Sequence, residues 1–188
     1  NPTKVNVGDR FMVPGLDNIM VEILPAHHSV ESIGYGFISV KKKLKPEYLE
    51  IAKSKKKEDR DKFMELVNDS SIEISHLVEK PELAFFSDST IDNLTKHEEW
   101  KKYPIIISEC TGFDEVHTPE KVTEMSHTHW SQLFPVMEQH KDKEWIVIHT
   151  SMGIDNDVID KYQKIMDSEG INGYIWKSGL VVDGITYS

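Results

Sequence analysis

The chain has 188 residues, of which 38% are hydrophobic and 29% charged, so it is long enough for one domain with a sizeable core. No apolar run reaches the roughly 18 residues of a membrane-spanning helix, and the single cysteine, Cys110, excludes an intramolecular disulfide and fits a reducing compartment. The net charge of −10 argues against nonspecific binding of nucleic acid over the whole surface.

Strand-like patterns dominate the first part of the chain. Apolar residues alternate or cluster at strand length, with Gly8 as a turn signal after the first residues. A helix-prone stretch follows, with Pro46 in its first turn, and it predicts either one helix or two helices broken around the lysines. We expect strands at 4–13, 19–26, 34–40, 71–75 and 82–87, and helical structure at 46–69.

From residue 90 onward, helical and strand patterns alternate along the chain. Pro135 lies inside one predicted helix and should bend it, and Gly170 ends another. A strand-rich first part followed by this alternation predicts a layered α/β fold. We expect helices at 90–100, 118–125, 128–140 and 155–170, and strands at 103–110, 144–151, 174–176 and 179–188.

One segment carries a charge opposite to that of the rest of the chain. Residues 41–57 hold eight lysines and two glutamates, a local charge of +6, which leaves −16 on the remainder. Such asymmetry is typical of a polyanion-binding arm on an acidic body. It also fits a solvated, lysine-rich helix, and composition alone favours this second interpretation.

Polar residues follow several apolar strands at their carboxyl ends, where α/β folds tend to build their sites. His28, Asp88 and His149 each follow such a strand, and Glu109 ends another. Two histidines and a carboxylate are good ligands for zinc-like metals. Their spacings of 60 and 61 residues form no local motif, however, so each could also be a satisfied polar residue near a turn.

Five segments together resemble a known enzyme family. They are HSVESIGY (28–35), AFFSDST (84–90), IIISECT (105–111), SHTHWSQL (126–133) and WIVIHTS (145–151). In this order they resemble the second half of ribonuclease Z, the tRNA 3′-processing endonuclease of the metallo-β-lactamase superfamily. SVKKKLKPEYL resembles the short form found in plants. The resemblance covers most of residues 20–152 and implies an α/β, metallo-β-lactamase-like αβ/βα sandwich. Residues 1–188 would form its C-terminal half as a single domain, with an inserted arm at 41–69.

The resemblance also implies roles for individual residues. His28 matches a ligand of the first of two zinc ions, Asp88 matches the aspartate that bridges them, and His149 matches a ligand of the second. His127 matches a histidine that pairs with a glutamate matching Glu109 and is not itself a ligand. The pair would protonate the leaving 3′-oxygen as a general acid.

The basic segment lies where the family inserts an RNA-binding arm, which favours the arm over the solvated helix. Its lysines would make salt-sensitive, sequence-independent contacts to the phosphates of precursor tRNA. The candidate RNA-binding residues are Lys41, Lys42, Lys43, Lys45, Lys55, Lys56 and Lys57. We expect His129 and His27 to be ordinary surface residues, His129 near the start of a helix.

The sequence departs from the family in several places. The His-x-His-x-Asp-His motif, which supplies ligands to both zinc ions, is absent, and the chain begins at Asn1. We therefore expect a fragment or subunit that needs a missing N-terminal half, with weak metal binding and no activity alone. Residues 87–89 read Ser-Asp-Ser where the family has Gly-Asp-Thr, and residues 152–154 replace a usual Arg-Tyr pair.

Two other functions stay open at this point. One is another hydrolase of the superfamily that acts on a small phosphodiester or ester, although such an enzyme has no use for a lysine arm. The other is a non-catalytic RNA-binding or scaffold subunit, which the absent motif favours and the intact Asp88, Glu109, His127 and His149 disfavour.

An RNA-processing protein is expected inside the cell, in the cytoplasm, the nucleus or an organelle, and not in a membrane. The family also suggests a homodimer.

Overall fold

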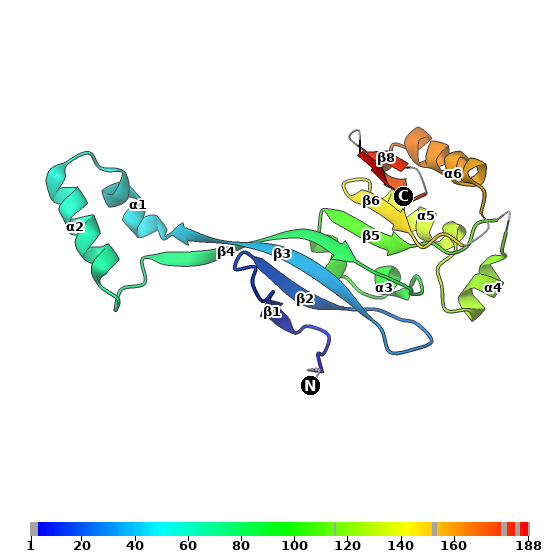
Figure 1. The fold of residues 1–188 in the computed structure, drawn as a ribbon, viewed down its shortest axis with the longest axis horizontal. Helices are drawn as coiled ribbons and strands as arrows, with labels where there is room; N and C mark the ends of the chain where they lie inside the picture. The colour runs from blue at the N-terminus through cyan, green and yellow to red at the C-terminus, as the bar shows by residue number, and fades with distance from the viewer. Residues whose placement is uncertain (1–3, 115, 152–153, 178–179, 183–184, 188) are drawn as a thin grey trace.

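A computed structural model of the chain describes residues 4–114, 116–151, 154–177, 180–182 and 185–187 (Figure 1). It confirms the predicted α/β class: a seven-stranded mixed sheet is combined with helices. Within the described residues, no helix has the length and apolar character needed to cross a membrane.

The strands lie in the sheet in the same order as in the sequence. Strands β1 to β4 pair antiparallel, and β4 to β7 pair parallel. Two further short strands, β8 (Leu180–Val182) and β9 (Ile185–Tyr187), pair with each other. The sheet strands are β1 (Arg10–Met12), β2 (Ile19–Pro25), β3 (Ile33–Leu44), β4 (Ser75–Phe85), β5 (Ile105–Glu109), β6 (Glu144–Ile148) and β7 (Asn172–Ile175).

Helices occupy the connections between these strands. They are α1 (Pro46–Lys53), α2 (Lys57–Asn68), α3 (Asp92–Thr95), the 3₁₀ helix η1 (Glu99–Lys102), α4 (Pro119–Glu124), α5 (Trp130–Gln139) and α6 (Asn156–Ser168). The predicted helices at 118–125, 128–140 and 155–170 are confirmed to within two residues at each end. The parallel strands are joined through these helices, as expected for crossovers between parallel neighbours.

The hydrophobic core lies on one face of the sheet. Alternate strand residues on this face are fully buried and join the side chains of α3, α5 and α6 in one cluster. Because side chains alternate across a strand, the same strands present a second set of residues to the opposite face. The core members include Ile38, Ala84, Ile106 and Val147 from the strands, and Leu94, Leu133, Met137, Ile159 and Met166 from the helices.

The opposite face of the sheet is apolar but stays partly exposed. Cross-strand partners such as Tyr35 and Phe85, or Phe37 and Leu83, bring these side chains together on one surface. We call this surface the open face. It consists of the half-buried residues Tyr35, Phe37, Leu83, Phe85, Ile105, Ile107, Ile146 and Ile148. Contiguous apolar patches of this kind mark interaction surfaces in soluble proteins.

Strands β3 and β4 extend far beyond the rest of the sheet as a two-stranded ribbon. Beyond Ser39, strand β3 pairs only with β4, because its pairing with β2 ends there. Figure 1 shows α1 and α2 at the far end of this ribbon, on the left of the view. Residues 40–79 therefore project as an arm whose tip is the helix pair.

Several predicted boundaries are wrong, mostly in this arm. The predicted strand at 34–40 continues to Leu44 and takes in Lys41–Lys43. The strand predicted at 71–75 is absent up to residue 74, and β4 instead runs unbroken from Ser75 to Phe85. Pairing within the ribbon extends both strands, although their exposed residues carry no apolar alternation. The region 90–100 forms only two short turns of helix, α3 and η1. Of the strand predicted at 179–188, residues 179, 183–184 and 188 lie outside the described part.

A polar network joins β2 to the segment before β5 at the root of the arm. Glu22 accepts hydrogen bonds from the Lys102 ammonium at 2.5 Å and from the Tyr103 hydroxyl at 2.7 Å. Tyr103 is fully buried beneath Gly36, where an added Cβ would lie 1.9 Å from the hydroxyl oxygen. Burial raises the pKa of the Glu22 carboxyl, but the bonds from Lys102 and Tyr103 lower it by more, so the net pKa is below its ordinary value of 4.5.

The Glu22 carboxylate is expected to make unfolding pH-dependent. A carboxyl whose pKa is lower in the folded chain adds stability above its ordinary pKa, and this stability is lost as pH falls through the folded value. Urea unfolding between about pH 6 and pH 3 should therefore show a falling free energy that is less steep in Glu22→Gln. The exposed Glu31→Gln variant is the control, and an unchanged slope in Glu22→Gln would contradict the expectation.

Candidate functional site

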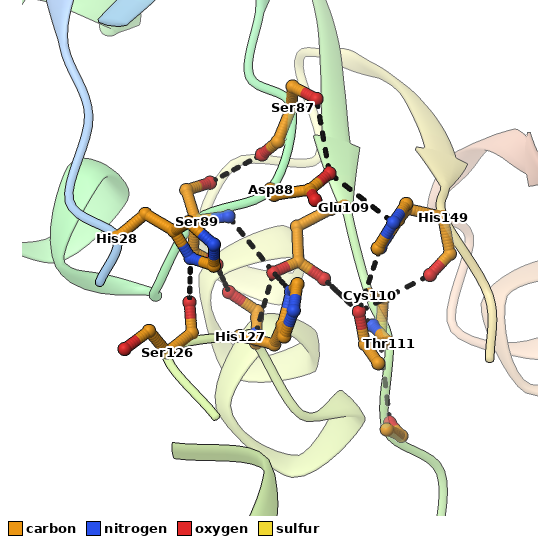
Figure 2. A network of polar contacts seen from close by, with 12 residues as sticks. His28, Ser87, Asp88, Ser89, Glu109, Cys110, Thr111, Ser126, His127 and His149 are labelled. Atoms are coloured by element: carbon orange, nitrogen blue, oxygen red, sulfur yellow. Dashed lines mark hydrogen bonds and ion pairs between the residues drawn. The ribbon is translucent and has the colours of Figure 1, made fainter. Parts of the chain in front are cut away.

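The predicted site residues meet at one edge of the sheet (Figure 2). Glu109 is the last residue of β5, Asp88 follows β4, and His149 directly follows β6. These three strands are parallel neighbours, so their carboxyl ends lie at the same edge. His28 lies between β2 and β3, and His127 lies between α4 and α5. The structure thus brings together all five residues from four strand ends and one loop.

Glu109 is a fully buried carboxylate surrounded by hydrogen-bond donors. One oxygen accepts from the backbone N–H groups of Ser89 at 3.1 Å and Thr128 at 2.9 Å. The other accepts from the backbone N–H of Thr111 at 2.9 Å and from its hydroxyl at 2.7 Å. These four donors, three main-chain N–H groups and one hydroxyl, compensate the buried charge and fix the carboxylate in place.

His127 completes the shell around Glu109. Its Nδ1 lies 3.0 Å from the first carboxylate oxygen, and its side chain is 16% exposed. A carboxylate can only accept hydrogen bonds, so Nδ1 carries a hydrogen and Nε2 is the nitrogen left for other chemistry. The ring lies between the other site histidines, with centroids 5.0 Å from His28 and 5.3 Å from His149. The predicted pairing of His127 with Glu109 is present.

His149 is oriented through the hydroxyl of Thr111. That hydroxyl donates to Glu109, so its oxygen is free to accept from His149 Nδ1 at 3.0 Å. The arrangement leaves Nε2 of His149 facing Asp88, whose Oδ1 lies 3.3 Å away. The two predicted ligands are therefore side by side, and both are about two-fifths exposed.

His28 is oriented by a backbone carbonyl. Its Nδ1 lies 2.9 Å from the oxygen of Ser126, which can only accept, so His28 also presents Nε2. Ser126 and His149 both adopt left-handed backbone conformations, with φ of 65° and 58°. Such conformations are strained for residues other than glycine and are concentrated at functional sites. Here they turn one carbonyl and one imidazole into the site.

Two overlapping groups of side chains have donor atoms close enough to share a cation. His28, Asp88 and His127 form one group, and Glu109, His127 and His149 form the other, with all donor atoms within 4.8 Å of one another. The histidines offer Nε2 in the tautomer that their Nδ1 partners impose, as zinc-bound histidines usually do. Imidazole nitrogen and carboxylate oxygen are the donors that zinc prefers, so these residues fit zinc ligation.

Cys110 lies in the same loop but takes no part in this donor set. Burial, reinforced by the negative charge of Glu109, raises the pKa of the Cys110 thiol well above its ordinary value. The thiol therefore stays protonated, whereas a metal ligand or nucleophile would need the thiolate. Its Sγ instead lies 3.5 Å from the carbonyl oxygen of Gly112.

The prediction that His129 is a surface residue is wrong. Its side chain is fully buried, and it caps α5 by accepting a hydrogen bond from the backbone N–H of Ser131 at 3.2 Å. Its Nε2 donates to the carbonyl of His117 at 3.1 Å. Both ring nitrogens are thus used within the fold. Gln132 bonds back to the backbone N–H of His129 at 3.0 Å, so a polar residue followed three positions later by glutamine was an available signal for a helix start.

Sequence reasoning also missed the residues that support the site. Thr111 connects Glu109 with His149, and Ser89 connects the Asp88 turn with Glu109. Ser89 is itself held by Thr128, whose hydroxyl donates to its carbonyl at 2.8 Å. Only the position of Thr111, two residues after Glu109, hinted at such a role.

The candidate RNA-binding lysines lie along the arm. Lys41, Lys42 and Lys43 are exposed in β3, and Lys55, Lys56 and Lys57 are exposed where α1 gives way to α2. Within the described residues, only Lys45 of the seven forms an ion pair, with Glu73 at 3.6 Å. The basic groups of the arm are therefore available to an anionic partner.

Replacing Thr111 with valine is expected to disorient His149. The variant keeps the shape of the side chain but removes the hydroxyl that Glu109 and His149 share. The unfolding free energy should fall by about 1–3 kcal/mol, because a buried carboxylate is deprived of a donor. Long-range ¹H–¹⁵N NMR spectra of the histidine rings should show His149 losing its single tautomer while His28 keeps its own. Retention of the tautomer in Thr111→Val would contradict this account, and Thr95→Val, at an exposed residue of α3, is the control.

Comparisons with known proteins give curated relatives and a solved structure of the same fold. No family model matches the chain. The chain is 28% identical over 137 residues to tRNase Z TRZ2, chloroplastic, from Arabidopsis thaliana, which covers 72% of this chain and 36% of that protein. It is 26% identical over 153 residues to tRNase Z TRZ1 from the same plant, covering 80% and 51%.

A solved structure supports the same fold. The metallo-β-lactamase fold protein YhfI from Bacillus subtilis aligns with a TM-score of 0.51 at 13% identity, over 94% of this chain and 53% of that one. The predicted metallo-β-lactamase fold is confirmed, and so is the resemblance to ribonuclease Z. The chain spans between about a third and about half of the length of the curated relatives that it matches.

Proposed function

We propose that this chain, a metallo-β-lactamase fold that resembles tRNase Z, contributes part of the active site of a zinc-dependent endoribonuclease. The reaction is hydrolytic removal of the 3′ trailer from precursor tRNA. The observation that carries the proposal is the contact of His127 with the buried Glu109, 3.0 Å long, beside Asp88 and His149. Metal-assisted phosphodiester hydrolysis needs metal ligands and a proton donor close together, and both are present at this edge of the sheet.

His28, Asp88 and His149 would hold two zinc ions, with Asp88 between them. Bound zinc would lower the pKa of a water molecule and share the negative charge of the phosphodiester. His28 and His149 favour this assignment because each has its Nδ1 occupied by an acceptor and presents Nε2. Ser126 and Thr111 hold those rings in place before any ion binds.

In this proposal His127 carries the proton for the leaving group. Hydrolysis breaks the bond between phosphorus and the 3′-oxygen, and that oxygen leaves as a hydroxyl after taking the Nε2 proton of His127 in its doubly protonated, imidazolium form. The attacking water supplies the new hydroxyl on phosphorus, and its other proton restores the imidazolium. Glu109 accepts the Nδ1 hydrogen of His127 and orients the ring, and four other donors hold Glu109 in place. Glu109 is thus a positioning residue and His127 the catalytic one.

The remaining metal ligands would come from outside these 188 residues. His28, Asp88 and His149 supply three protein ligands, whereas two zinc ions in ordinary four-coordinate sites need more than three even when a water and a carboxylate are shared. The family's His-x-His-x-Asp-His motif is not in the sequence. The open face supports a polypeptide partner that carries it, since an apolar sheet face is stable in water only when another layer covers it.

The arm would bind the body of the tRNA. Its exposed lysines lie on a projection from an otherwise acidic chain, so the positive charge is concentrated away from the site edge. Phosphate contacts of this kind are independent of sequence and weaken steeply with salt.

The proposal places the protein in a compartment where precursor tRNA is made. The homodimer stays a prediction.

Substituting the arm lysines is expected to weaken tRNA binding without changing its sequence preference. Lys55, Lys56 and Lys57 replaced together by glutamine should reduce the slope of log affinity against log salt by roughly 0.7–0.9 for each phosphate that the arm no longer neutralises. Fluorescence anisotropy with labelled precursor tRNA measures this slope. Lys164→Gln, at an exposed lysine of α6 outside the arm, is the control. An unchanged slope in the triple variant would remove the arm from the interface.

The function itself is tested by cleavage of precursor tRNA with protein expressed under an affinity tag in its natural host. Purification under mild conditions retains whatever polypeptide supplies the missing ligands. Release of the 3′ trailer, with a 3′-hydroxyl on the tRNA, is the expected result. Binding of tRNA without cleavage would instead support the non-catalytic subunit, and hydrolysis of small phosphodiesters without tRNA cleavage would support the other superfamily hydrolase.

A further inference from the structure

A second pair of histidines lies outside the site described above. His27 and His97 are 70 residues apart in the sequence, yet their Nε2 atoms lie 2.9 Å apart. Their rings are nearly parallel, with an interplanar angle of 18° and centroids 5.1 Å apart. Two imidazole nitrogens at this distance share a single hydrogen, since a neutral ring has one donor and one acceptor.

One histidine of the pair is held through its backbone, and the other has a carboxylate nearby. The backbone carbonyl of His27 accepts from the N–H of Thr90 at 2.7 Å, which ties His27 to the segment after Asp88. Nδ1 of His97 lies 4.0 Å from a carboxylate oxygen of Glu99. A carboxylate behind one ring nitrogen favours the tautomer in which the other nitrogen is unprotonated and can bind a metal. His27 is exposed, so a cation can reach the pair from solvent.

We propose that His27 and His97 form a second binding site for a divalent transition-metal ion, supported by Glu99. Zinc, copper or nickel ions suit two imidazole ligands, whereas calcium and magnesium do not. The ion would replace the hydrogen between the two Nε2 atoms, and that proton would pass to solvent. Water molecules would complete the coordination, which makes this an open and exchangeable site.

The geometry requires only a small adjustment. Two nitrogens that each lie about 2.0–2.1 Å from zinc at a tetrahedral angle are about 3.4 Å apart. The pair must therefore open by roughly half an ångström and turn its lone pairs toward a common point. Exposure of His27 allows that movement. Once bound, the ion would connect the loop that holds His27 with the segment that follows α3. The same loop is already bonded to the segment after Asp88, through the N–H of Thr90.

The test uses a variant in which two proposed zinc ligands of the candidate active site are substituted, so that zinc bound at His27 and His97 is measured separately. The 188-residue chain carrying Asp88→Asn and His149→Gln is titrated with zinc chloride by isothermal calorimetry, with folding checked by circular dichroism. We expect one saturable zinc ion per chain. Adding His97→Gln should abolish it, and adding Glu99→Gln should weaken it by about tenfold or more, as removal of an orienting carboxylate does. His76→Gln, at an exposed histidine of β4, is the matched control and should change nothing.

A second measurement identifies the ligands directly. Zinc X-ray absorption of the loaded double variant should show scattering from two imidazole rings, and from none after His97→Gln. No saturable zinc in the double variant would overturn the proposal, and so would binding that survives His97→Gln. These measurements do not depend on the proposed function. The proposed function has its own test: it fails if the tagged native protein carries no zinc that is lost in Asp88→Ala.

Discussion

Replacing Asp88 with alanine should remove the zinc that the tagged native protein carries and abolish its cleavage of precursor tRNA. Asp88 belongs to one of the two groups of candidate ligands and lies 3.3 Å from His149 of the other, so its carboxylate contacts both groups. Loss of metal removes several kcal/mol of transition-state stabilisation, which is on the order of a thousandfold or more in rate. Elemental analysis gives zinc per chain, and a gel assay gives cleavage.

The control for this variant is Asp92→Ala. Asp92 is also an aspartate close to the same turn, but it pairs with Lys96 on the surface of α3. It should keep both zinc and activity. Zinc near zero in the unaltered protein, unchanged by Asp88→Ala, would mean that these residues hold no metal. The chain would then be a non-catalytic relative, and His127 and Glu109 would have no reaction to serve.

Replacing His127 with alanine should lower cleavage by about 10²–10⁴-fold while leaving zinc content unchanged. The size is that of a missing general acid. His127 belongs to both groups of donor atoms, so the structure alone allows it to be a ligand. Its contact with Glu109 argues for the proton-donor role, and zinc content distinguishes the two. A fall in zinc together with activity would make His127 a ligand and overturn the assignment.

A change of substrate sharpens the same test. An aryl phosphodiester has a leaving group that departs without protonation, so a general acid contributes little to its hydrolysis. His127→Ala should therefore be far less defective with such a substrate than with precursor tRNA, whereas Asp88→Ala should be defective with both. Glu109→Gln combined with His127→Ala should be worse than His127→Ala alone, because Glu109 also holds Ser89 beside Asp88 and Thr111 beside His149.

The strand pattern placed the candidate residues at strand ends, and the resemblance to ribonuclease Z assigned their roles. His28, Asp88 and His149 follow apolar strands and Glu109 ends one, and parallel strands bring their ends together. The supporting residues were not predictable in this way. Thr111 and Ser126 act through a hydroxyl and a carbonyl whose directions depend on local backbone angles, and these angles follow from tertiary contacts.

The arm was harder to predict for a different reason. Lys41–Lys43 have no apolar alternation, so their strand conformation comes from pairing with 76–78 across the ribbon rather than from a buried face. His129 was misplaced because burial of a histidine depends on whether both ring nitrogens find partners, and one of them is the distant carbonyl of His117. Residues 152–154, where the family has a different pair, lie largely outside the described part.

The β3–β4 ribbon gives the arm a mechanical connection to the metal ligands. His28 lies just before β3 and Asp88 just after β4, so both strands that carry the tip also end at the site. Beyond Ser39 the ribbon has only two strands, so it can twist more readily than the seven-stranded sheet. A β-bulge at Phe37 and Ile38 lies close to the point where the ribbon leaves the sheet. The backbone runs without a break from the helical tip to His28 along β3 and to Asp88 along β4. The arm and the candidate metal ligands are therefore parts of one two-stranded lever, whose orientation is set at the bulge.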